Sequence, residues 1–396
     1  MTEWKRVKLG DICYITSSKR IFAMEYQKEG IPFYRGKEII EKHQGNNVST
    51  ELFISRQRYE EIRTKYDVPK RGDILLSSVG TLGVSWLVDE DEFYFKDGNL
   101  TWLRPNELTT SNYLYLWLNS PDCQHQIDTM CIGSTQKALT IETLNKFNVL
   151  LPDIITQKKI CAQLHPIMEK IKNNRMINEN LAHQARAMFQ QWLAKATGSL
   201  CHLAEIADIN PETYSTKDNW EFVNYLDTSN ITTGTIAEVQ YIQPSQEKLP
   251  SRARRILRKN DIVYSTVRPN QLHYGIISNP LPNMLGSTGF AVIRSKRKII
   301  PNEIIYLALT DPAFVEKMHQ LAEQSVSTYP SIKPLDLNAC VIPEPQQDDA
   351  DFTNAIITIF DIIASNNEEN RRLAELCDTL LPRLMSGELD VSALGL

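Results

Sequence analysis

The sequence feature that most constrains the fold is an internal duplication. Segments of the first half reappear in the same order in the second half, at offsets of 188 to 194 residues. The matched segments are Arg71–Val79 with Lys259–Val267, Tyr115–Pro121 with Tyr306–Pro312, Leu151–Pro152 with Ile342–Pro343, and Leu9, Asp11, Ile12 and Ile15 with Leu203, Glu205, Ile206 and Ile209. Several ordered matches at a nearly constant offset predict two copies of one structural unit.

Each copy has the same internal plan. Roughly the first 150 residues alternate short β-type runs, such as Ile74–Leu76, with Gly, Pro and Asn, which is typical of short strands joined by turns. Pro152 and Pro343 end these regions, and a helical segment follows each of them. Together these patterns predict an α+β fold, with α/β domains at residues 1–153 and 199–345 and helical spacers at residues 154–198 and 346–396.

The two helical segments carry apolar residues at alternating spacings of four and three. In the first segment these positions are Ile160, Leu164, Ile167, Ile171, Leu181, Ala185, Met188 and Trp192. In the second segment they are Phe352, Ile356, Ile359, Ile363, Leu373, Cys377, Leu380 and Leu384. A 4-3 repeat sustained over this length predicts a coiled coil, and we call this row of positions the seam. Two ordinary amphipathic helices in separate cores are the alternative.

Asparagines fill the two interruptions of each seam and indicate how the helices pair. Asn174 and Asn178 lie in the first seam, and Asn366 and Asn370 lie in the second. Antiparallel pairing places Asn174 opposite Asn370 and Asn178 opposite Asn366, where buried amides fix the register at a cost in stability. We therefore predict an intramolecular antiparallel coiled coil and a pseudo-twofold relation between the copies. Pro166 is expected to break or kink the first helix near its start.

The composition is that of a globular protein without export or membrane signals. Hydrophobic residues make up 42% and charged residues 23% of the chain. No stretch approaches the roughly 20 apolar residues that a membrane span requires. The N-terminal segment lacks the apolar core of a secretory signal, and the seven cysteines include no Cys-x-x-Cys pair. We expect a cytoplasmic protein with free thiols, no disulfide framework and no structural metal site.

Positive charge is concentrated in the second copy, although the net charge of the chain is −5. Residues 251–300 hold ten Lys and Arg residues against one acidic residue, whereas residues 346–396 hold three basic and ten acidic residues. A basic cluster within eight residues consists of Arg252, Arg254, Arg255, Arg258 and Lys259. This density suits contacts with nucleic-acid phosphates, and a solvated surface is the alternative.

A loop-like stretch that follows this basic cluster offers side chains that can read base edges. Its candidates are Arg268, which suits guanine, Asn270 and Gln271, which suit adenine, and His273. In the first copy the candidates are the basic residues Lys19, Arg20, Arg35 and Lys37 and the polar loop residues Ser134, Thr135, Gln136 and Lys137. The counterpart of that loop in the second copy contains Thr328 and Tyr329. A surface turn without a ligand is the alternative for both loops.

The sequence contains none of the common catalytic motifs. It has no P-loop, no G-x-G-x-x-G, no G-x-S-x-G and no H-E-x-x-H. The seven histidines form no close pair with metal-ligand spacing. We predict a non-catalytic protein that binds nucleic acid. The alternatives are an enzyme with an unrecognised site, such as a nuclease, and a coiled-coil scaffold that binds no nucleic acid.

Several short phrases occur in a fixed order along the chain. They are Trp4–Asp11, Gly30–Phe33, Arg71–Ile74, Gly133–Lys137, Met188–Leu193 and Leu380–Gly387. With these phrases and the order domain, helix, domain, helix, the chain resembles the specificity subunit of type I restriction–modification systems over essentially all 396 residues. The second copy carries Ser-Thr-Tyr-Pro in place of the Gly-Ser-Thr-Gln-Lys loop. We therefore expect the two copies to read different half-sites, which are the two halves of a split DNA sequence.

The resemblance implies a function for each part. Each α/β copy would be a target-recognition domain that reads one half of a split DNA sequence, and the paired helices would set the gap between the halves. Two methyltransferase subunits carrying S-adenosylmethionine would dock on the chain, and a restriction subunit using ATP and Mg²⁺, if one is present, would complete a nuclease for host defence. The chain itself would hold no cofactor.

Apolar residues off the seam offer a further expectation about these partners. Phe189, Leu193 and Leu381 are candidates for contacts with other subunits, because two paired helices bury only one stripe against each other. Packing on the chain's own domains is the alternative.

Overall fold

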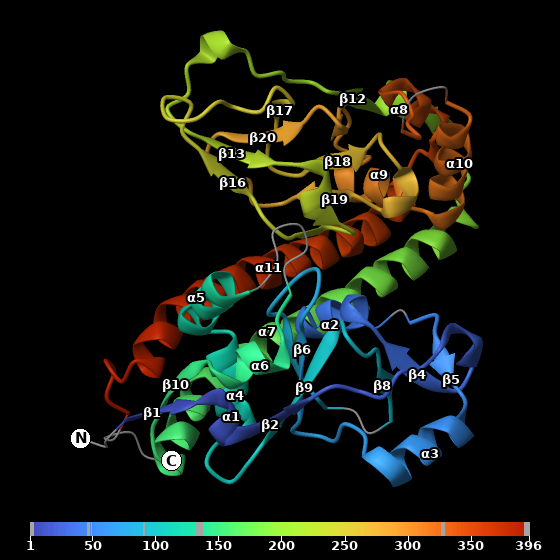
Figure 1. Ribbon diagram of the computed structural model, residues 1–396. Coiled ribbons are helices and arrows are strands. Elements are labelled where there is room, and N and C mark those ends of the chain that lie inside the picture. Colours follow the sequence, from blue (N-terminus) through green and yellow to red (C-terminus); the bar gives the residue numbers. More distant parts are fainter. Residues whose placement is uncertain are drawn as a thin grey trace. The chain divides into compact units, whose positions relative to one another are not determined.

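The chain folds into two compact mixed α/β units. The computed structural model describes residues 4–45, 48, 50–89, 92–131, 138–325 and 329–391. Unit 1 comprises Met1–Asn173 with Asn370–Leu396, and unit 2 comprises Asn174–Glu369. Figure 1 shows short strands and helices in both units together with two long helices, α7 (Ile154–Leu193) and α11 (Ala350–Met385). The mixed α/β class and the long helices agree with the predicted fold class.

In the described part of unit 1, short strands form two four-stranded sheets and one strand pair, in the orders β2-β9-β6-β7, β3-β5-β4-β8 and β1-β10. The strands are β1 (Lys5–Lys8), β2 (Cys13–Thr16), β3 (Tyr26–Gln27), β4 (Ile31–Tyr34), β5 (Phe53–Ile54), β6 (Ile74–Ser77), β7 (Ser85–Leu87), β8 (Tyr94–Phe95), β9 (Leu100–Pro105) and β10 (Asn148–Leu151). The helices are α1 (Leu9–Ile12), α2 (Gly36–His43), α3 (Arg56–Tyr66), α4 (Ser111–Leu118), α5 (Pro121–Met130) and α6 (Ile141–Asn145), with a 3-10 turn η1 (Ala23–Glu25). Strand β6 is buried along its whole length, as expected for its continuous apolar run.

In the described part of unit 2, the sheets have the orders β12-β21-β18-β19 and β16-β13-β20-β17, with the pairs β11-β22 and β14-β15. The strands are β11 (Leu200–His202), β12 (Ala207–Ile209), β13 (Val223–Leu226), β14 (Ile231–Thr232), β15 (Thr235–Ile236), β16 (Gln240–Ile242), β17 (Ala253–Ile256), β18 (Asp261–Ser265), β19 (Tyr274–Ile277), β20 (Met284–Ser287), β21 (Phe290–Ser295) and β22 (Val341–Pro343). The helices are α8 (Leu203–Ile206), α9 (Asn302–Leu309) and α10 (Pro312–Glu323), with the 3-10 segments η2 (Thr216–Asp218), η3 (Thr228–Asn230), η4 (Pro269–Gln271), η5 (Pro334–Ala339) and η6 (Gln347–Asp349).

The strand orders of the two units match, which confirms the internal duplication. Strands β2, β9, β6 and β7 of unit 1 occupy the places of β12, β21, β18 and β19 in unit 2. The second sheets share a parallel pair, β4 with β8 in unit 1 and β13 with β20 in unit 2. They differ at both edges, because unit 1 has β3 beyond β5, whereas unit 2 has β17, which carries residues of the basic cluster, beyond β20.

The long helices bury the seam that the 4-3 spacing predicts. All twenty seam positions, the four asparagines included, are buried or half-buried. In unit 2, α7 and α11 contact each other directly, because the rings of Trp192 and Phe352 stack at 4.8 Å and the Asn366 amide donates to Asn178 Oδ1 at 2.8 Å. In unit 1, Ile160 and Leu164 of α7 share a hydrophobic core with Leu384 of α11.

Two expectations about the helices are corrected. Helix α7 is continuous through Pro166 and is not broken there. A proline inside a helix costs about 3 kcal/mol, and the neighbouring burial of Ile160 and Leu164, both at most 1% exposed, offsets this cost. Phe189 is not available to a partner subunit, because it is 3% exposed and packs in the core of unit 2.

Candidate nucleic-acid interface

The basic cluster of unit 2 lies on strand β17 and on the turn that leads into β18. Arg252, Arg258 and Lys259 are exposed, whereas Arg254 and Arg255 are half-buried. Arg254 Nε donates to the backbone carbonyl of Ser251 at 3.3 Å. Burial lowers the pKa of the Arg255 guanidinium, and its Nε has no hydrogen-bond partner among the described residues. The cluster therefore presents three cationic side chains to solvent and holds two closer to the sheet.

Arg258 belongs to an ion-pair network inside the unit. Its guanidinium donates to both carboxylate oxygens of Glu212, at 2.7 Å from Nη2 and 3.3 Å from Nε. Arg294 donates to the same carboxylate at 2.7 Å and also forms a two-pronged ion pair with the fully buried Asp261, at 2.7 and 2.8 Å. These hydrogen bonds from Arg258 and Arg294 lower the pKa of Glu212 to about 2. Arg258 thus has a structural partner, unlike the other exposed members of the basic cluster.

The turn η4 presents the predicted base-reading residues in a compact arrangement. Pro269 is buried and anchors the turn, whereas Arg268, Asn270 and Gln271 are exposed. The guanidinium of Arg268 lies over the ring of Tyr329 at 5.1 Å from the centroid. The structure therefore brings together two predicted residues that are about 60 positions apart in the sequence, Arg268 and Tyr329.

His273 is held by the backbone of its own unit. Its Nδ1 lies 2.6 Å from the carbonyl oxygen of Ile231 and 3.2 Å from Thr232 Oγ1, so Nδ1 carries the proton and donates to the carbonyl. Ile231 and Thr232 form strand β14, whose hairpin is also bonded to Leu272 through the N–H of Thr233 at 2.9 Å. His273 thus anchors the chain that follows η4, a second role that no sequence pattern indicated.

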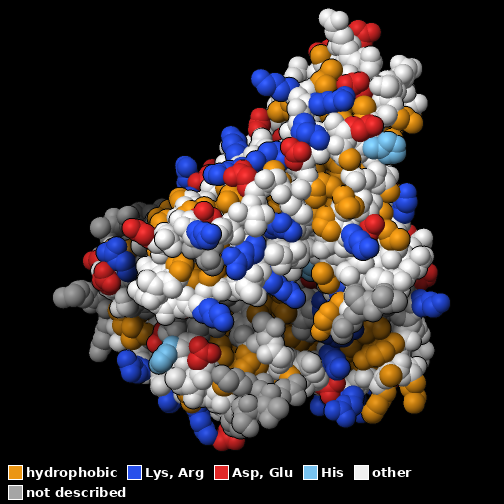
Figure 2. Space-filling model, turned by 90° about the horizontal axis from the view of Figure 1, so that it is seen from above, with side chains coloured by type: hydrophobic (Ala, Val, Ile, Leu, Met, Phe, Trp, Pro, Cys, Tyr) orange, Lys and Arg blue, Asp and Glu red, His pale blue; other side chains and the backbone are white. Residues whose placement is uncertain are grey.

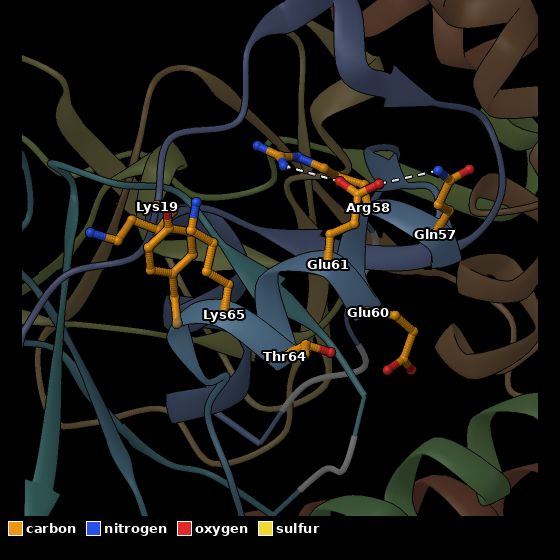
Figure 3. A pocket seen from close by; sticks show the side chains of 8 residues that line it. Lys19, Gln57, Arg58, Glu60, Glu61, Thr64 and Lys65 are labelled. Atoms are coloured by element: carbon orange, nitrogen blue, oxygen red, sulfur yellow. Dashed lines mark hydrogen bonds and ion pairs between the residues drawn. The ribbon is translucent and has the colours of Figure 1, made fainter.

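In unit 1, Lys19 and Arg20 lie on the segment that passes along helix α3. Lys19 Nζ lies 4.7 Å from the ring centroid of Tyr66, at the end of α3, and Lys65 approaches the same ring at 5.1 Å. Figure 3 shows Lys19 beside this helix at a shallow groove, with Glu61 bonded to Gln57 and Arg58 on the helix surface. Arg20 Nε donates to Asp97 at 2.9 Å. This surface carries acidic and basic side chains. Lys19 is its clearest candidate for a phosphate contact, because it lies against an aromatic ring whereas Arg20 pairs with Asp97.

Arg35 and Lys37 lie at the start of helix α2. Arg35 donates to the buried Glu38 at 2.9 Å from Nη2, and this hydrogen bond raises the pKa of the Arg35 guanidinium. Lys37 Nζ lies 3.6 Å from Glu41, one turn further along the helix. Both residues line a groove that also includes Val79 and Thr81, at the end of the β6 region. Arg35 and Lys37 therefore lie near Ala138, because Ala138 pairs with Val79. Ala138 directly follows the polar loop of unit 1 in the sequence.

Five predicted contact residues lie outside the described residues. They are Ser134, Thr135, Gln136 and Lys137 in unit 1 and Thr328 in unit 2. Their roles in DNA binding stay predictions.

On the face shown in Figure 2, Lys and Arg side chains lie scattered among acidic and apolar ones. Across the residues that the structure describes, no three His, Cys, Asp or Glu side chains group so that they could hold a metal ion. In the same part of the chain, no helix combines the length and the apolar character needed to cross a membrane.

Known proteins share this plan. Residues 1–183 match the family described as type I restriction modification DNA specificity domain. The type I restriction enzyme HindI specificity subunit of Haemophilus influenzae is 22% identical over 475 residues, covering 98% of this chain and 100% of the relative. Residues 1–183 thus match the DNA specificity domain of type I systems, and the whole chain is similar to a type I specificity subunit.

Two further comparisons extend this result. A putative type I restriction enzyme specificity subunit of Haemophilus influenzae, S.HindORF215P, is 30% identical over 164 residues, which is 40% of this chain and 39% of that relative. The crystal structure of the type-I restriction-modification system S subunit from M. genitalium has the same fold, with a TM-score of 0.54 at 15% identity over 97% of this chain and 96% of that chain. Specificity subunits are the non-catalytic, DNA-recognising component of type I systems, which favours the main hypothesis over an unrecognised enzyme.

The acidic partners of these arginines were not predicted from the sequence. The repeated phrase around Asp73 and Asp261 contained a usable signal, because both carboxylates cap the same turn. Asp73 accepts from the N–H of Lys70 at 2.9 Å, and Asp261 accepts from the N–H of Arg258 at 2.7 Å. A repeated Asp three residues after a basic residue therefore indicates a turn cap, and Glu212 carried no such signal.

Proposed function

We propose that this specificity subunit reads a DNA target in two halves, one half in each unit. The observation that carries the proposal is the repeated strand order, β2-β9-β6-β7 in unit 1 and β12-β21-β18-β19 in unit 2. The two units share one scaffold but carry different surface residues. They would therefore bind DNA in the same manner and prefer different base sequences. The domain boundaries at 153, 198 and 345 are part of this proposal.

In unit 2, the basic cluster would hold phosphates and the turn η4 would read bases. Arg252 and Lys259 are exposed and are our main phosphate contacts, with Arg254 and Arg255 behind them. Arg268, Asn270 and Gln271 are exposed on one short turn, which suits contact with base edges in a groove. Arg258 contributes less than the other members of the cluster, because Glu212 neutralises it.

In unit 1, phosphate contacts would come from Lys19, Arg20, Arg35 and Lys37. Lys19 is exposed beside Tyr66, and the other three each have a carboxylate neighbour within 3.6 Å. Base contacts in this unit would come from the polar loop 134–137, which precedes the pairing of Ala138 with Val79.

The long helices would set the gap between the half-sites and bind the partner subunits. Two modification subunits carrying S-adenosylmethionine, and a restriction subunit using ATP and Mg²⁺ where one is present, would supply the chemistry in the cytoplasm. Helix residues that stay exposed although apolar support a docking role for the off-seam surface. They are Met176 and Ile177 on α7 and Ile362 and Leu376 on α11, each more than 40% exposed.

Binding by the complex of this chain with its methyltransferase subunits tests the proposal. We expect selection from a random DNA library to yield two short motifs separated by a fixed number of unspecified bases. Binding should weaken steeply as salt rises, because phosphate contacts release counterions. The Arg252→Ala variant should weaken all sequences alike, since a phosphate contact carries no sequence information.

Two outcomes would contradict the proposal. A purified complex that does not bind DNA would favour a coiled-coil scaffold, and one that binds DNA without sequence preference would exclude a reading role. Cleavage or methylation of DNA by this chain alone with Mg²⁺ would favour an enzyme with an unrecognised site.

A further inference from the structure

Both units place a residue of left-handed backbone conformation at the same point of the fold. In unit 1, Val79 pairs with Ala138 and the next residue, Gly80, has φ +83°. In unit 2, Val267 pairs with Ser331 and the next residue, Arg268, has φ +48°. Gly80 and Arg268 are therefore equivalent, as the sequence offset of 188 residues in this region also indicates.

The surrounding hydrogen bonds support this equivalence. In unit 1 the N–H of Leu139 donates to the carbonyl of Ser78 at 2.9 Å, and in unit 2 the N–H of Ile332 donates to the carbonyl of Thr266 at 2.9 Å. In each unit this hydrogen bond thus joins a later segment of the chain to the residue two positions before the left-handed residue. In unit 2 the N–H of Arg268 also donates to the carbonyl of Pro330 at 2.9 Å.

The fold itself does not require an arginine at this point. Glycine adopts positive φ without steric cost, whereas a side chain with a Cβ is strained there. Unit 1 uses glycine, and unit 2 keeps an arginine in the same conformation. Strained residues of this kind are retained where the side chain has a function.

The side chain of Arg268 is free to serve such a function. Within the described part of the chain its guanidinium forms no ion pair or hydrogen bond, in contrast to Arg258 and Arg294. Its side-chain contact is the face of Tyr329, which is itself 57% exposed. Stacking on a ring holds the guanidinium plane while leaving its N–H edges outward.

We propose that Arg268 reads a guanine in the half-site of unit 2 and that Tyr329 is the residue that positions it. The fork of the guanidinium matches the O6 and N7 acceptors of guanine in the major groove. Gly80 has no side chain, so unit 1 has no reader at the equivalent point, and the two half-sites differ there. This inference rests on the proposed function and names the base that one of its sites takes.

The test measures methylation of a DNA library, randomised in one half-site at a time, by the complex of the full chain with its methyltransferase subunits. The wild-type complex should require G·C at one position of the second half-site. Arg268→Gly, which copies unit 1 and relieves the backbone strain, should fold as well as the wild type. It should reduce discrimination at that position by about 10-fold to 100-fold and leave the first half-site unchanged.

Variants of Tyr329 separate positioning from structure. Tyr329→Phe keeps the ring face and should keep the preference for guanine, whereas Tyr329→Ala should weaken the preference at the same position. Arg252→Ala is the matched control in the same unit, and it should lower methylation of all sequences alike.

Several results would overturn the inference while leaving the proposed function intact. These are a wild-type second half-site without a fixed G·C pair, relaxation by Arg268→Gly at an A·T position, or a uniform loss across all sequences that marks Arg268 as a phosphate contact. A Tyr329→Ala complex with wild-type discrimination would remove Tyr329 from the mechanism. A wild-type complex without any sequence preference would instead overturn the proposed function itself.

Discussion

At the scale of single residues, the arginines of unit 2 divide by their partners. Arg258 and Arg294 share the carboxylate of Glu212, and Arg294 also pairs with the buried Asp261. Arg268 instead lies on the ring of Tyr329, and its guanidinium N–H groups form no hydrogen bond within the described residues. All of these arginines look alike in a charge count along the sequence. Which of them is available to DNA depends on acidic residues 33 to 82 positions away, which the sequence does not connect to them.

Removing the buried carboxylate of the network should destabilise unit 2. Asp261 is fully buried and binds Arg294 at 2.7 Å, so Asp261→Asn removes the buried one of the two carboxylates, Asp261 and Glu212, that pair with this half-buried guanidinium. We expect a loss of about 3 kcal/mol in the free energy of unfolding, measured by denaturant titration. Asp208→Asn, in an exposed pair with Lys296 at 3.6 Å, is the control and should change stability by less than about 0.5 kcal/mol. Equal losses of stability for the two substitutions would show that this ion-pair network does not stabilise unit 2.

Glu212 should make part of the stability depend on pH. Hydrogen bonds from Arg258 and Arg294 lower its pKa from 4.5 to about 2 in the folded chain. A lowered carboxyl pKa contributes stability that is complete above the unfolded value and is lost as the pH falls through the folded value. Wild-type stability should therefore decrease between pH 4.5 and about 2, and Glu212→Gln should show a smaller decrease. Glu221→Gln, at an exposed position, should retain the wild-type pH profile. Parallel profiles for wild type and Glu212→Gln would contradict the assignment.

At the scale of elements, the helices followed most directly from the sequence. The 4-3 spacing predicted both long helices, and every seam position is buried or half-buried. Periodicity gives this information because it reports which side of a helix faces the core. The continuity of α7 through Pro166 could not be predicted, because it depends on the packing of the turns around the proline.

The asparagines of the seam differ in how closely they follow the prediction. Asn178 pairs with Asn366 as antiparallel pairing requires. Asn174 donates to Glu369 at 2.7 Å. Glu369 directly precedes Asn370, the expected partner of Asn174. A role of these asparagines in fixing the register stays a prediction.

Asn178 and Asn366 should show coupled effects on stability. Asn178→Leu alone leaves the Asn366 amide without this partner and should cost about 1 to 2 kcal/mol. The double variant with leucine at both positions removes the polar pair and should be nearly neutral or more stable. A double-mutant cycle by denaturant unfolding measures the difference, with the exposed Asn180→Leu as the control. Additive costs in the double variant would show that the two amides do not act as a pair.

At the scale of the whole molecule, duplication explains the plan of the chain. The ordered sequence matches predicted two copies, and the strand orders of the units agree. The edge strand β17 was not predicted, because the described residues of unit 1 form no strand at that place and the arginines of β17 were interpreted only as charge. The candidate site was predicted as a basic cluster and loop-like stretches, but the partners of each side chain could be identified only in the structure.

The central claim is that one chain carries two readers of different DNA sequences. The most direct test maps methylated bases in genomic DNA from cells with and without this protein. We expect methylation at a split motif with a fixed gap, and we expect this methylation to be absent from cells without the protein. Exchange of residues 199–345 for the corresponding segment of another specificity subunit should change only one half of the motif. A continuous motif, or methylation that does not depend on this chain, would contradict the account.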